Sequence, residues 1–170
     1  MAVDAHKANE RKVKCMILTV SDTRSEYTDK SGKLIEQLLN ASGHHIEIME
    51  IISDKQQSIK SMIDAGRENP DIDVILTNGG TGIAHRDVTI ETVKPMLEKE
   101  ITGFGELFRS LSYSEDIGSA AMLSRAIAGV TNHTAVFSMP GSTGAVRLAM
   151  ERLILPELSH VVNEIQKDLH

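Results

Sequence analysis

The segment Thr77-Asn78-Gly79-Gly80-Thr81-Gly82 follows a short apolar run, Val74-Ile75-Leu76, and carries three glycines in four positions. Glycine adopts positive φ angles without steric cost, so successive backbone N–H groups in such a loop can converge on one anion. A loop of this kind at the end of a strand is a candidate binding site for a phosphate or a nucleotide. A tight turn that simply leaves the strand is an equally good interpretation of this loop taken alone, because short glycine patterns are common.

A second glycine-containing loop, Ser138-Met139-Pro140-Gly141-Ser142, follows the apolar run Ala135-Val136-Phe137 and leads into a predicted helix. Unpaired N–H groups at the start of that helix, near Ser142, can bind a phosphate through hydrogen bonds and the helix dipole. An N-cap role alone is the alternative for Ser142, since serine is a favoured cap residue. Neither loop contains Gly-Lys-Ser/Thr or Gly-x-Gly-x-x-Gly, which excludes these familiar ATPase and dehydrogenase motifs.

Three aspartates follow predicted strands: Asp22 beside Ser21, Asp54, and Asp87 beside Arg86. Carboxylates that face phosphate-binding loops are typical of a Mg²⁺ ion held between protein and nucleotide, and Asp54 and Asp87 are the expected ligands. Loop capping is the alternative role for Asp22, and helix capping is the alternative for Asp87. The histidines show no zinc-ligand spacing, so a zinc centre is not expected.

The elements that must position these residues follow from the apolar pattern. Buried runs and alternating runs predict strands, and apolar residues at helical spacing predict helices between them. Because the strand-to-strand connections are long enough to hold helices, parallel pairing is expected. The predicted strands are 16–20, 45–52, 72–76 and 135–137, and the predicted helices are 34–39, 59–63, 89–94, 105–111, 118–128 and a final helix after Gly144 with a kink at Pro156.

Ligands of a parallel α/β sheet bind beyond the carboxyl ends of its strands. Four of the predicted strands end in loops that carry polar or glycine residues: 21–25, 53–54, 77–87 and 138–144. In a parallel sheet all four loops lie at one edge. This coincidence favours a binding site over four unrelated turns.

Composition narrows the class of protein. The chain has 170 residues and one cysteine, Cys15, within an apolar run, so we expect a single domain at 13–170, a flexible arm at 1–12, a buried thiol and a reducing, cytoplasmic location. No apolar run reaches the roughly 20 residues of a membrane helix, and no secretory signal precedes the first strand. The formal net charge of −6 and the absence of a basic cluster argue against a nucleic-acid partner.

Taken together, these motifs resemble the MoaB/Mog family of molybdenum cofactor biosynthesis. The resemblance rests on Asn78-Gly79-Gly80-Thr81-Gly82, Arg86-Asp87-Val88-Thr89 and Pro140-Gly141-Ser142, which occur in the family's order. The stretches 108–113, 121–126 and 128–129 are similar to the MoaB branch. Altogether the similarity covers about residues 13–165.

The resemblance implies a three-layer α/β/α fold with a mostly parallel central sheet, assembled as a homotrimer or a homohexamer. It implies that the loops bind molybdopterin and that other molybdenum cofactor biosynthesis proteins are possible partners. It also implies adenylyl transfer, in which molybdopterin and Mg-ATP give adenylylated molybdopterin and pyrophosphate. Asp54 and Asp87 match the family's functional aspartates and would act as catalytic and Mg²⁺-binding residues. The residues that would bind substrate or nucleotide are Ser21, Asp22, Asn78, Gly79, Gly80, Thr81, Gly82, Arg86, Ser138, Pro140, Gly141 and Ser142.

The segment around the first aspartate departs from the Mog-type pattern. That pattern commonly reads Pro-Asp-Glu, whereas this chain has Ser53-Asp54-Lys55. Two functions therefore stay open at this point. One is a molybdopterin adenylyltransferase, and the other is a non-catalytic protein that binds molybdopterin and hands it on.

Overall fold

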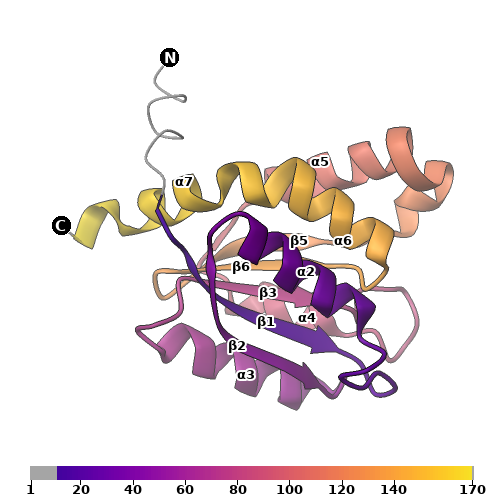
Figure 1. The fold of residues 1–170 in the computed structure, drawn as a ribbon. Helices are drawn as coiled ribbons and strands as arrows, with labels where there is room; N and C mark the ends of the chain where they lie inside the picture. The colour runs from indigo at the N-terminus through magenta and orange to yellow at the C-terminus, as the bar shows by residue number, and fades with distance from the viewer. Residues whose placement is uncertain (1–10, 170) are drawn as a thin grey trace.

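A six-stranded sheet with the spatial order β2-β1-β3-β6-β5-β4 forms the centre of the computed structural model, which describes residues 11–169 (Figure 1). Strands β2, β1, β3 and β6 run parallel, whereas β5 is antiparallel to both β6 and β4. The predicted, mostly parallel sheet is thereby confirmed. The strands are β1 (Lys14–Val20), β2 (His45–Ile52), β3 (Val74–Asn78), β4 (Lys99–Glu100), β5 (Ile127–Thr131) and β6 (Thr134–Met139).

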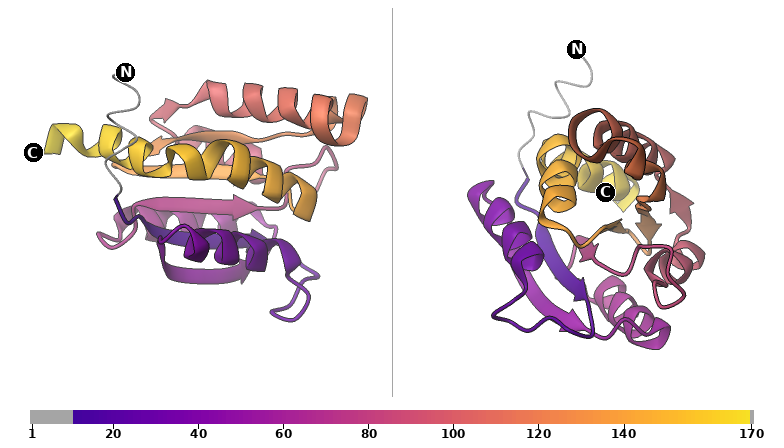
Figure 2. Two further views of the ribbon diagram at one scale, coloured as in Figure 1. Left: turned by 45° about the horizontal axis from the view of Figure 1, so that its top comes forward. Right: turned by 90° about the vertical axis from the view of Figure 1, so that its right-hand side faces the viewer.

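Helices cover both faces of the sheet, which gives the expected three layers (Figure 2). Helices α2, α5, α6 and α7 lie on one face, and α3 and α4 lie on the other. The helices are α2 (Lys30–Ala41), α3 (Gln56–Glu68), α4 (Thr89–Val93), α5 (Thr102–Ser112), α6 (Thr143–Ala149) and α7 (Leu155–Gln166).

The apolar run of β1 is continuous because both faces of this strand are covered, as is usual for a central parallel strand. Cys15 and Ile17 pack in the core that contains Ile35 of α2, and Met16 packs on the other face with Ile59 of α3. All five side chains are fully buried. Two apolar cores, one on each face, therefore fix β1 in the middle of the molecule.

The register of the sheet brings the functional loops together. Asn78 at the end of β3 lies opposite Thr19 of β1 and Met139 of β6, and Val20 lies opposite Ile52 of β2. The four strands therefore end at one edge of the sheet. The loops that follow them are neighbours in space, as the sequence predicted.

The predicted helix over 118–128 is wrong. Only Gly118–Leu123 is helical, as a short 3₁₀ segment, and the following residues form β5, which pairs with β6 through a two-residue hairpin. Asn132 and His133 at the tip have φ angles of 48° and 64°. Two positive φ angles are typical of a type I′ turn, whose twist matches that of the strands. Pairing with β6 thus overrides the helical tendency of this alanine-containing segment.

The final helical region is irregular, as the kink predicted at Pro156 implied. A single π-helical turn, Met150–Ile154, separates α6 from α7, and Pro156 stands in the first turn of α7. Because the helical stretch continues from α6 through the π-turn into α7, Pro156 removes one N–H from it, and the wider π-turn just before Pro156 accommodates the missing hydrogen bond. Of the predicted arm, residues 1–12, all but 11 and 12 lie outside the described residues. Within residues 11–169, no helix is long and apolar enough to cross a membrane.

Candidate functional site

A cavity of about 410 Å³ opens at the carboxyl ends of the parallel strands. Its walls come from the loop after β1, the glycine loop after β3, the loop after β6, and the segment that precedes β5. Seven of the predicted binding residues line it, and so does the predicted catalytic Asp87. The lining residues are Val20, Ser21, Thr23, Arg24, Gly79, Gly80, Thr81, Gly82, Asp87, Leu123, Ser124, Arg125, Pro140 and Gly141.

The glycine loop has the backbone conformation that its sequence predicted. Gly79 and Gly80 have φ angles of 98° and 69°. A Cβ atom on Gly80 would lie 2.3 Å from Oγ1 of Thr89, and one on Gly79 would lie 2.4 Å from the carbonyl oxygen of Val20. Thr89 fixes the loop from α4, because its Oγ1 donates to Gly79 O at 3.0 Å and its backbone N–H donates to Gly80 O at 3.0 Å. Both glycines are therefore required by positive φ and by close packing.

Arg24 connects the loop after β1 to the loop after β6 and to the end of β3. Its Nη2 donates to the carbonyl oxygen of Gly141 at 2.8 Å, and its Nη1 donates to Oγ of Ser31 at 2.5 Å. Oγ of Ser31 in turn donates to Oδ1 of Asn78 at 2.7 Å. Asp29, which is 2% exposed, lies 3.7 Å from the guanidinium and caps α2 through Gly32 N–H. A buried polar network thus joins β1, β3, α2 and the loop after β6.

Arg125 has a similar role on the opposite wall. Its Nε donates to Thr81 O at 2.9 Å, and its Nη2 donates to Gly82 O at 2.7 Å. The same guanidinium pairs with Glu91 of α4, and this pairing lowers the pKa of Glu91. Arg125 thereby binds the carbonyl oxygens of the glycine loop and fixes the loop's orientation.

Asp22, Asp54 and Arg86 meet beside the cavity rather than within its lining. Nε of Arg86 donates to Oδ2 of Asp54 at 2.8 Å, and Nη2 donates to Oδ2 of Asp22 at 3.2 Å. The backbone N–H of Asp54 donates to Oδ1 of Asp22, and this bond is the main reason that the pKa of Asp22 is lowered. Three loops are therefore joined by one exposed arginine.

Asp87 lies apart from this cluster, on the cavity wall. Its Oδ2 accepts a hydrogen bond from the backbone N–H of Ala84 at 3.1 Å. The two predicted catalytic aspartates thus occupy different surroundings: Asp87 faces the cavity, and Asp54 is paired with Arg86.

Three other predicted residues have structural contacts. Ser138 is buried within β6, where its Oγ accepts from Oγ1 of Thr77 at 2.8 Å. Oγ of Ser142 accepts from Ala145 N–H at 3.2 Å, which is the N-cap alternative given above. Asn78 is fully buried and holds Ser31 and Arg24. These three residues lie outside the lining of the cavity.

Sequence reasoning placed Arg24 in the first strand-end loop without giving it a binding role, and it missed Arg125 as a site residue. Arg24 stands in the first strand-end loop, so its position was a usable signal. Arg125 lies in the segment predicted as helix, which hid its place at the edge of the cavity.

A Mg²⁺ ion was expected at Asp54 and Asp87. Among residues 11–169, no three or more histidine, cysteine, aspartate or glutamate side chains come together as a metal-binding group. The Mg²⁺ ion therefore stays a prediction; an ion shared with a nucleotide would need only one or two protein carboxylates, with phosphates and water as its other ligands. Asp87 meets that requirement as a carboxylate on the cavity wall.

Comparison with known proteins identifies the class of protein to which this fold and site belong. The family model described as "Probable molybdopterin binding domain" matches residues 16–160. The chain therefore belongs to the molybdopterin-binding domain family of molybdenum cofactor biosynthesis proteins, as its motifs predicted.

Individual relatives lie within the MoaB branch. The chain is 57% identical over 169 residues to the Bacillus subtilis (strain 168) molybdenum cofactor biosynthesis protein B, with 99% of each chain covered. A crystal structure of a molybdenum cofactor biosynthesis protein B is 58% identical, superposes with a TM-score of 0.91, and is matched over 92% of this chain and 98% of that one. The tungsten cofactor synthesizing protein MoaB from Pyrococcus furiosus is 36% identical, with a TM-score of 0.77 and coverage of 91% and 98%.

Proposed function

We propose that the cavity between the two glycine loops binds molybdopterin and that the protein adenylylates it with Mg-ATP. The carrying observation is the convergence of Gly79–Gly82, Pro140–Gly141 and the Asp87 carboxylate on one cavity. Backbone N–H groups suit phosphate oxygens, and a carboxylate on the same wall suits a nucleotide-bound cation.

In the proposed reaction, a phosphate oxygen of molybdopterin attacks the α-phosphorus of ATP. A new P–O–P bond forms, the α–β anhydride bond breaks, and pyrophosphate leaves. Chemistry of this kind depends mainly on positioning and on charge stabilisation. Mg²⁺ bound with ATP would neutralise phosphate charge, with Asp87 and, once released from Arg86, Asp54 as its protein ligands.

The arginines around the cavity support this reaction through the loops. Arg24 and Arg125 bind carbonyl oxygens of the second and first glycine loops, respectively. Because these carbonyl oxygens accept hydrogen bonds from the arginines, they would point away from the phosphates of the proposed ligand. The backbone N–H groups of the same loops would then contact those phosphates.

A binding and handover role without catalysis is the second candidate. The observation in its favour is the ion pair of Asp54 with Arg86, at 2.7 Å, outside the cavity lining. In this version the protein binds molybdopterin with an affinity that is indifferent to Mg-ATP.

Incubation of the purified protein with molybdopterin and Mg-ATP distinguishes the two candidates. The enzyme hypothesis expects pyrophosphate and an adenylylated pterin, and it expects Asp87→Asn to bind pterin but lose turnover. Glu151→Gln, at an exposed position on the π-turn, is the matched control and should keep full activity. Tight pterin binding with no pyrophosphate would support the handover role instead.

We also propose that the protein assembles as a homotrimer or a homohexamer. A cytoplasmic location and contacts with other molybdenum cofactor biosynthesis proteins are further parts of the proposal. Tyr113 and Met122 are 64% and 81% exposed, and Leu107 and Ile117 are also exposed near them in sequence. Large exposed apolar side chains near one another are typical of protein interfaces. Light scattering of the eluting protein should give a mass of three or six chains, and a monomer would contradict this part.

A further inference from the structure

One nitrogen atom of Arg86 lies between two carboxylates that come from different loops. Nη2 of Arg86 is 2.7 Å from Oδ2 of Asp54 and 3.2 Å from Oδ2 of Asp22. Nε of the same guanidinium donates to Oδ2 of Asp54 at 2.8 Å. Asp22 follows β1, Asp54 follows β2, and Arg86 follows β3. The guanidinium therefore occupies a place where carboxylate oxygens of two loops converge on a single positive charge.

The two carboxylates are held together by contacts that do not involve Arg86. The backbone N–H of Asp54 donates to Oδ1 of Asp22 at 3.2 Å, and the N–H of Ser21 donates to the carbonyl oxygen of Ile52 at 2.9 Å. The bond from Asp54 is the main reason that the pKa of Asp22 is lowered, so Asp22 is ionised at neutral pH. Removal of the guanidinium would thus leave both carboxylates in place.

The arginine is held less firmly than the carboxylates. Its side chain is 62% exposed, whereas that of Asp54 is 15% exposed. Among residues 11–169, the guanidinium of Arg86 has no hydrogen bond or ion pair besides those to Asp22 and Asp54. Exposed ion pairs contribute little to stability, so Arg86 can leave these carboxylates at small cost. It is the part of the cluster that can move.

The oxygen atoms around Arg86 suit a hard divalent cation. Mg²⁺ prefers carboxylate oxygens, and one or two of them suffice when phosphate groups supply further ligands. The pKa of Arg86 is raised, mainly by Asp54 and further by Asp22 and Asp87. Asp87, the next residue along the chain, lines the cavity proposed for the nucleotide phosphates. A cation in the place of the guanidinium would therefore lie beside that cavity.

We propose that Arg86 is a placeholder for a divalent cation: its guanidinium pairs with Asp22 and Asp54 before nucleotide binds, and it gives up these carboxylates to the Mg²⁺ that comes with the nucleotide. Because Mg-ATP is the proposed source of that cation, this role rests on the proposed function. The exchange replaces one positive charge by two, and the released guanidinium becomes free to pair with a phosphate. Arg86 is in this sense a positioning residue, which keeps the two carboxylates ready for the cation.

Binding of Mn²⁺ to the full chain, without nucleotide or pterin, tests the exchange. Free Mn²⁺ gives a sharp EPR spectrum that the bound ion loses, so the spectrum reports the fraction bound. Arg86→Gln removes the competing charge and should bind Mn²⁺ at least about tenfold more tightly than the wild type does. Asp54→Asn or Asp22→Asn, each combined with Arg86→Gln, should remove that gain.

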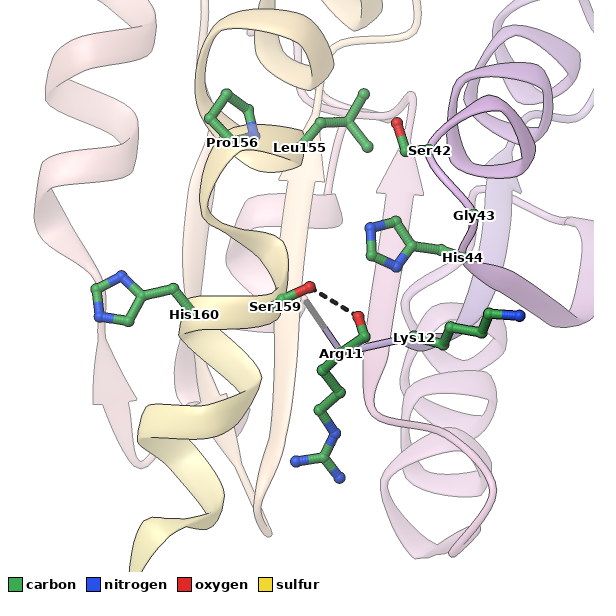
Figure 3. A pocket seen from close by; sticks show the side chains of 9 residues that line it. All are labelled: Arg11, Lys12, Ser42, Gly43, His44, Leu155, Pro156, Ser159 and His160. Carbon is green, nitrogen blue, oxygen red and sulfur yellow. Dashed lines mark hydrogen bonds between the residues drawn. The ribbon is translucent and has the colours of Figure 1, made fainter. Parts of the chain in front are cut away.

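Two other arginines serve as controls. Among residues 11–169, Arg147 pairs with one carboxylate, that of Glu151, and Arg11 pairs with none. Arg11 borders a separate cavity of about 380 Å³ near the start of β1, and Figure 3 shows its guanidinium directed away from His44 of that cavity. Arg147→Gln and Arg11→Gln should therefore bind Mn²⁺ as the wild type does.

A second measurement follows Arg86 itself in the ¹⁵N-labelled wild type. The NMR signal of the Arg86 Nε–H group, assigned by its loss in Arg86→Gln, should shift in a saturable way as Mg²⁺ is added. NaCl at the same ionic strength should leave this signal in place, which separates exchange of the cation from screening by salt.

Three results would overturn the proposal. They are equal Mn²⁺ affinity of Arg86→Gln and the wild type, a gain in affinity that persists in both double variants, and an Arg86 Nε–H signal that Mg²⁺ does not shift or that NaCl shifts equally. Neither measurement needs pterin or ATP. If both succeed while incubation with molybdopterin and Mg-ATP gives no pyrophosphate, the cation exchange stands and adenylylation alone fails.

Discussion

Replacement of Arg24 by methionine tests whether the polar network beneath the cavity stabilises the fold. The change keeps most of the side-chain volume but removes the donors to Gly141 O and to Ser31 Oγ, at 2.8 and 2.5 Å. It also leaves Asp29, which is 2% exposed, without the cation 3.7 Å away. The loss of one partner from a buried ion pair costs about 3–5 kcal/mol.

Two features reduce that cost. The Arg24 side chain is 31% exposed, so water can take over part of the lost contacts. Asp29 also keeps hydrogen bonds from Thr19 Oγ1 and Gly32 N–H. We therefore expect Arg24→Met to lower the free energy of unfolding by about 2–4 kcal/mol.

Urea unfolding at a fixed protein concentration measures this loss. Arg147→Met is the matched control, because Arg147 is 56% exposed and, within the described part of the chain, pairs only with Glu151 one helical turn away. Such a pair contributes about 0.5 kcal/mol or less. If Arg24→Met costs no more than Arg147→Met, the network does not stabilise the fold and the reasoning is refuted.

Three further predictions follow from the same contacts. Gly80→Ala should cost about 1–3 kcal/mol by urea unfolding, because of the positive φ and the 2.3 Å approach of the new Cβ to Thr89 Oγ1. Gly103→Ala should cost almost nothing, because its new Cβ meets no atom within 4 Å beyond its chain neighbours and the backbone of its own helix; equal effects would contradict the strain argument. Arg125→Ala should speed hydrogen exchange of the backbone amides of residues 81–87 by about tenfold or more, and Arg125→Lys should give an intermediate rate. Unchanged exchange would show that the hydrogen bonds of Arg125 do not stabilise the loop. Burial raises the pKa of the Cys15 thiol from 9.0 to about 12, so its contribution to stability is complete below pH 9 and is lost as the pH rises toward 12; Cys15→Ala should flatten this part of the stability curve, and an identical curve would refute the assignment.

Much of the fold could be predicted because the secondary structure that each segment favours by itself agrees with the place of that segment in the sheet. The continuous apolar run of β1 indicated a strand covered on both faces, and the chain order placed helices between parallel strands. Once the strands were parallel, their carboxyl ends had to share one edge, which brought Asp22, Asp54 and Arg86 together. No residue-by-residue contact was needed for that conclusion.

The missed parts depend on contacts between distant residues. The β5–β6 hairpin turns at Asn132 and His133, where positive φ occurs without a glycine to indicate it. Arg24 binds a carbonyl 117 residues away, and Arg125 binds one 44 residues away. Periodicity and turn composition describe near neighbours only, so they could not show that two arginines hold the glycine loops.

The central claim is that the glycine-loop cavity is the molybdopterin site. Leu123→Trp tests it most directly, because Leu123 lines the cavity and is 49% exposed, so a larger side chain can enter the cavity without disturbing the core. Equilibrium binding of molybdopterin to the wild type should give one site per chain, and Leu123→Trp should bind at least about tenfold more weakly. Leu169→Trp, at a similarly exposed position near the end of the chain, is the control and should bind as the wild type does. Equal affinity for the wild type and Leu123→Trp would contradict the account and place the pterin elsewhere.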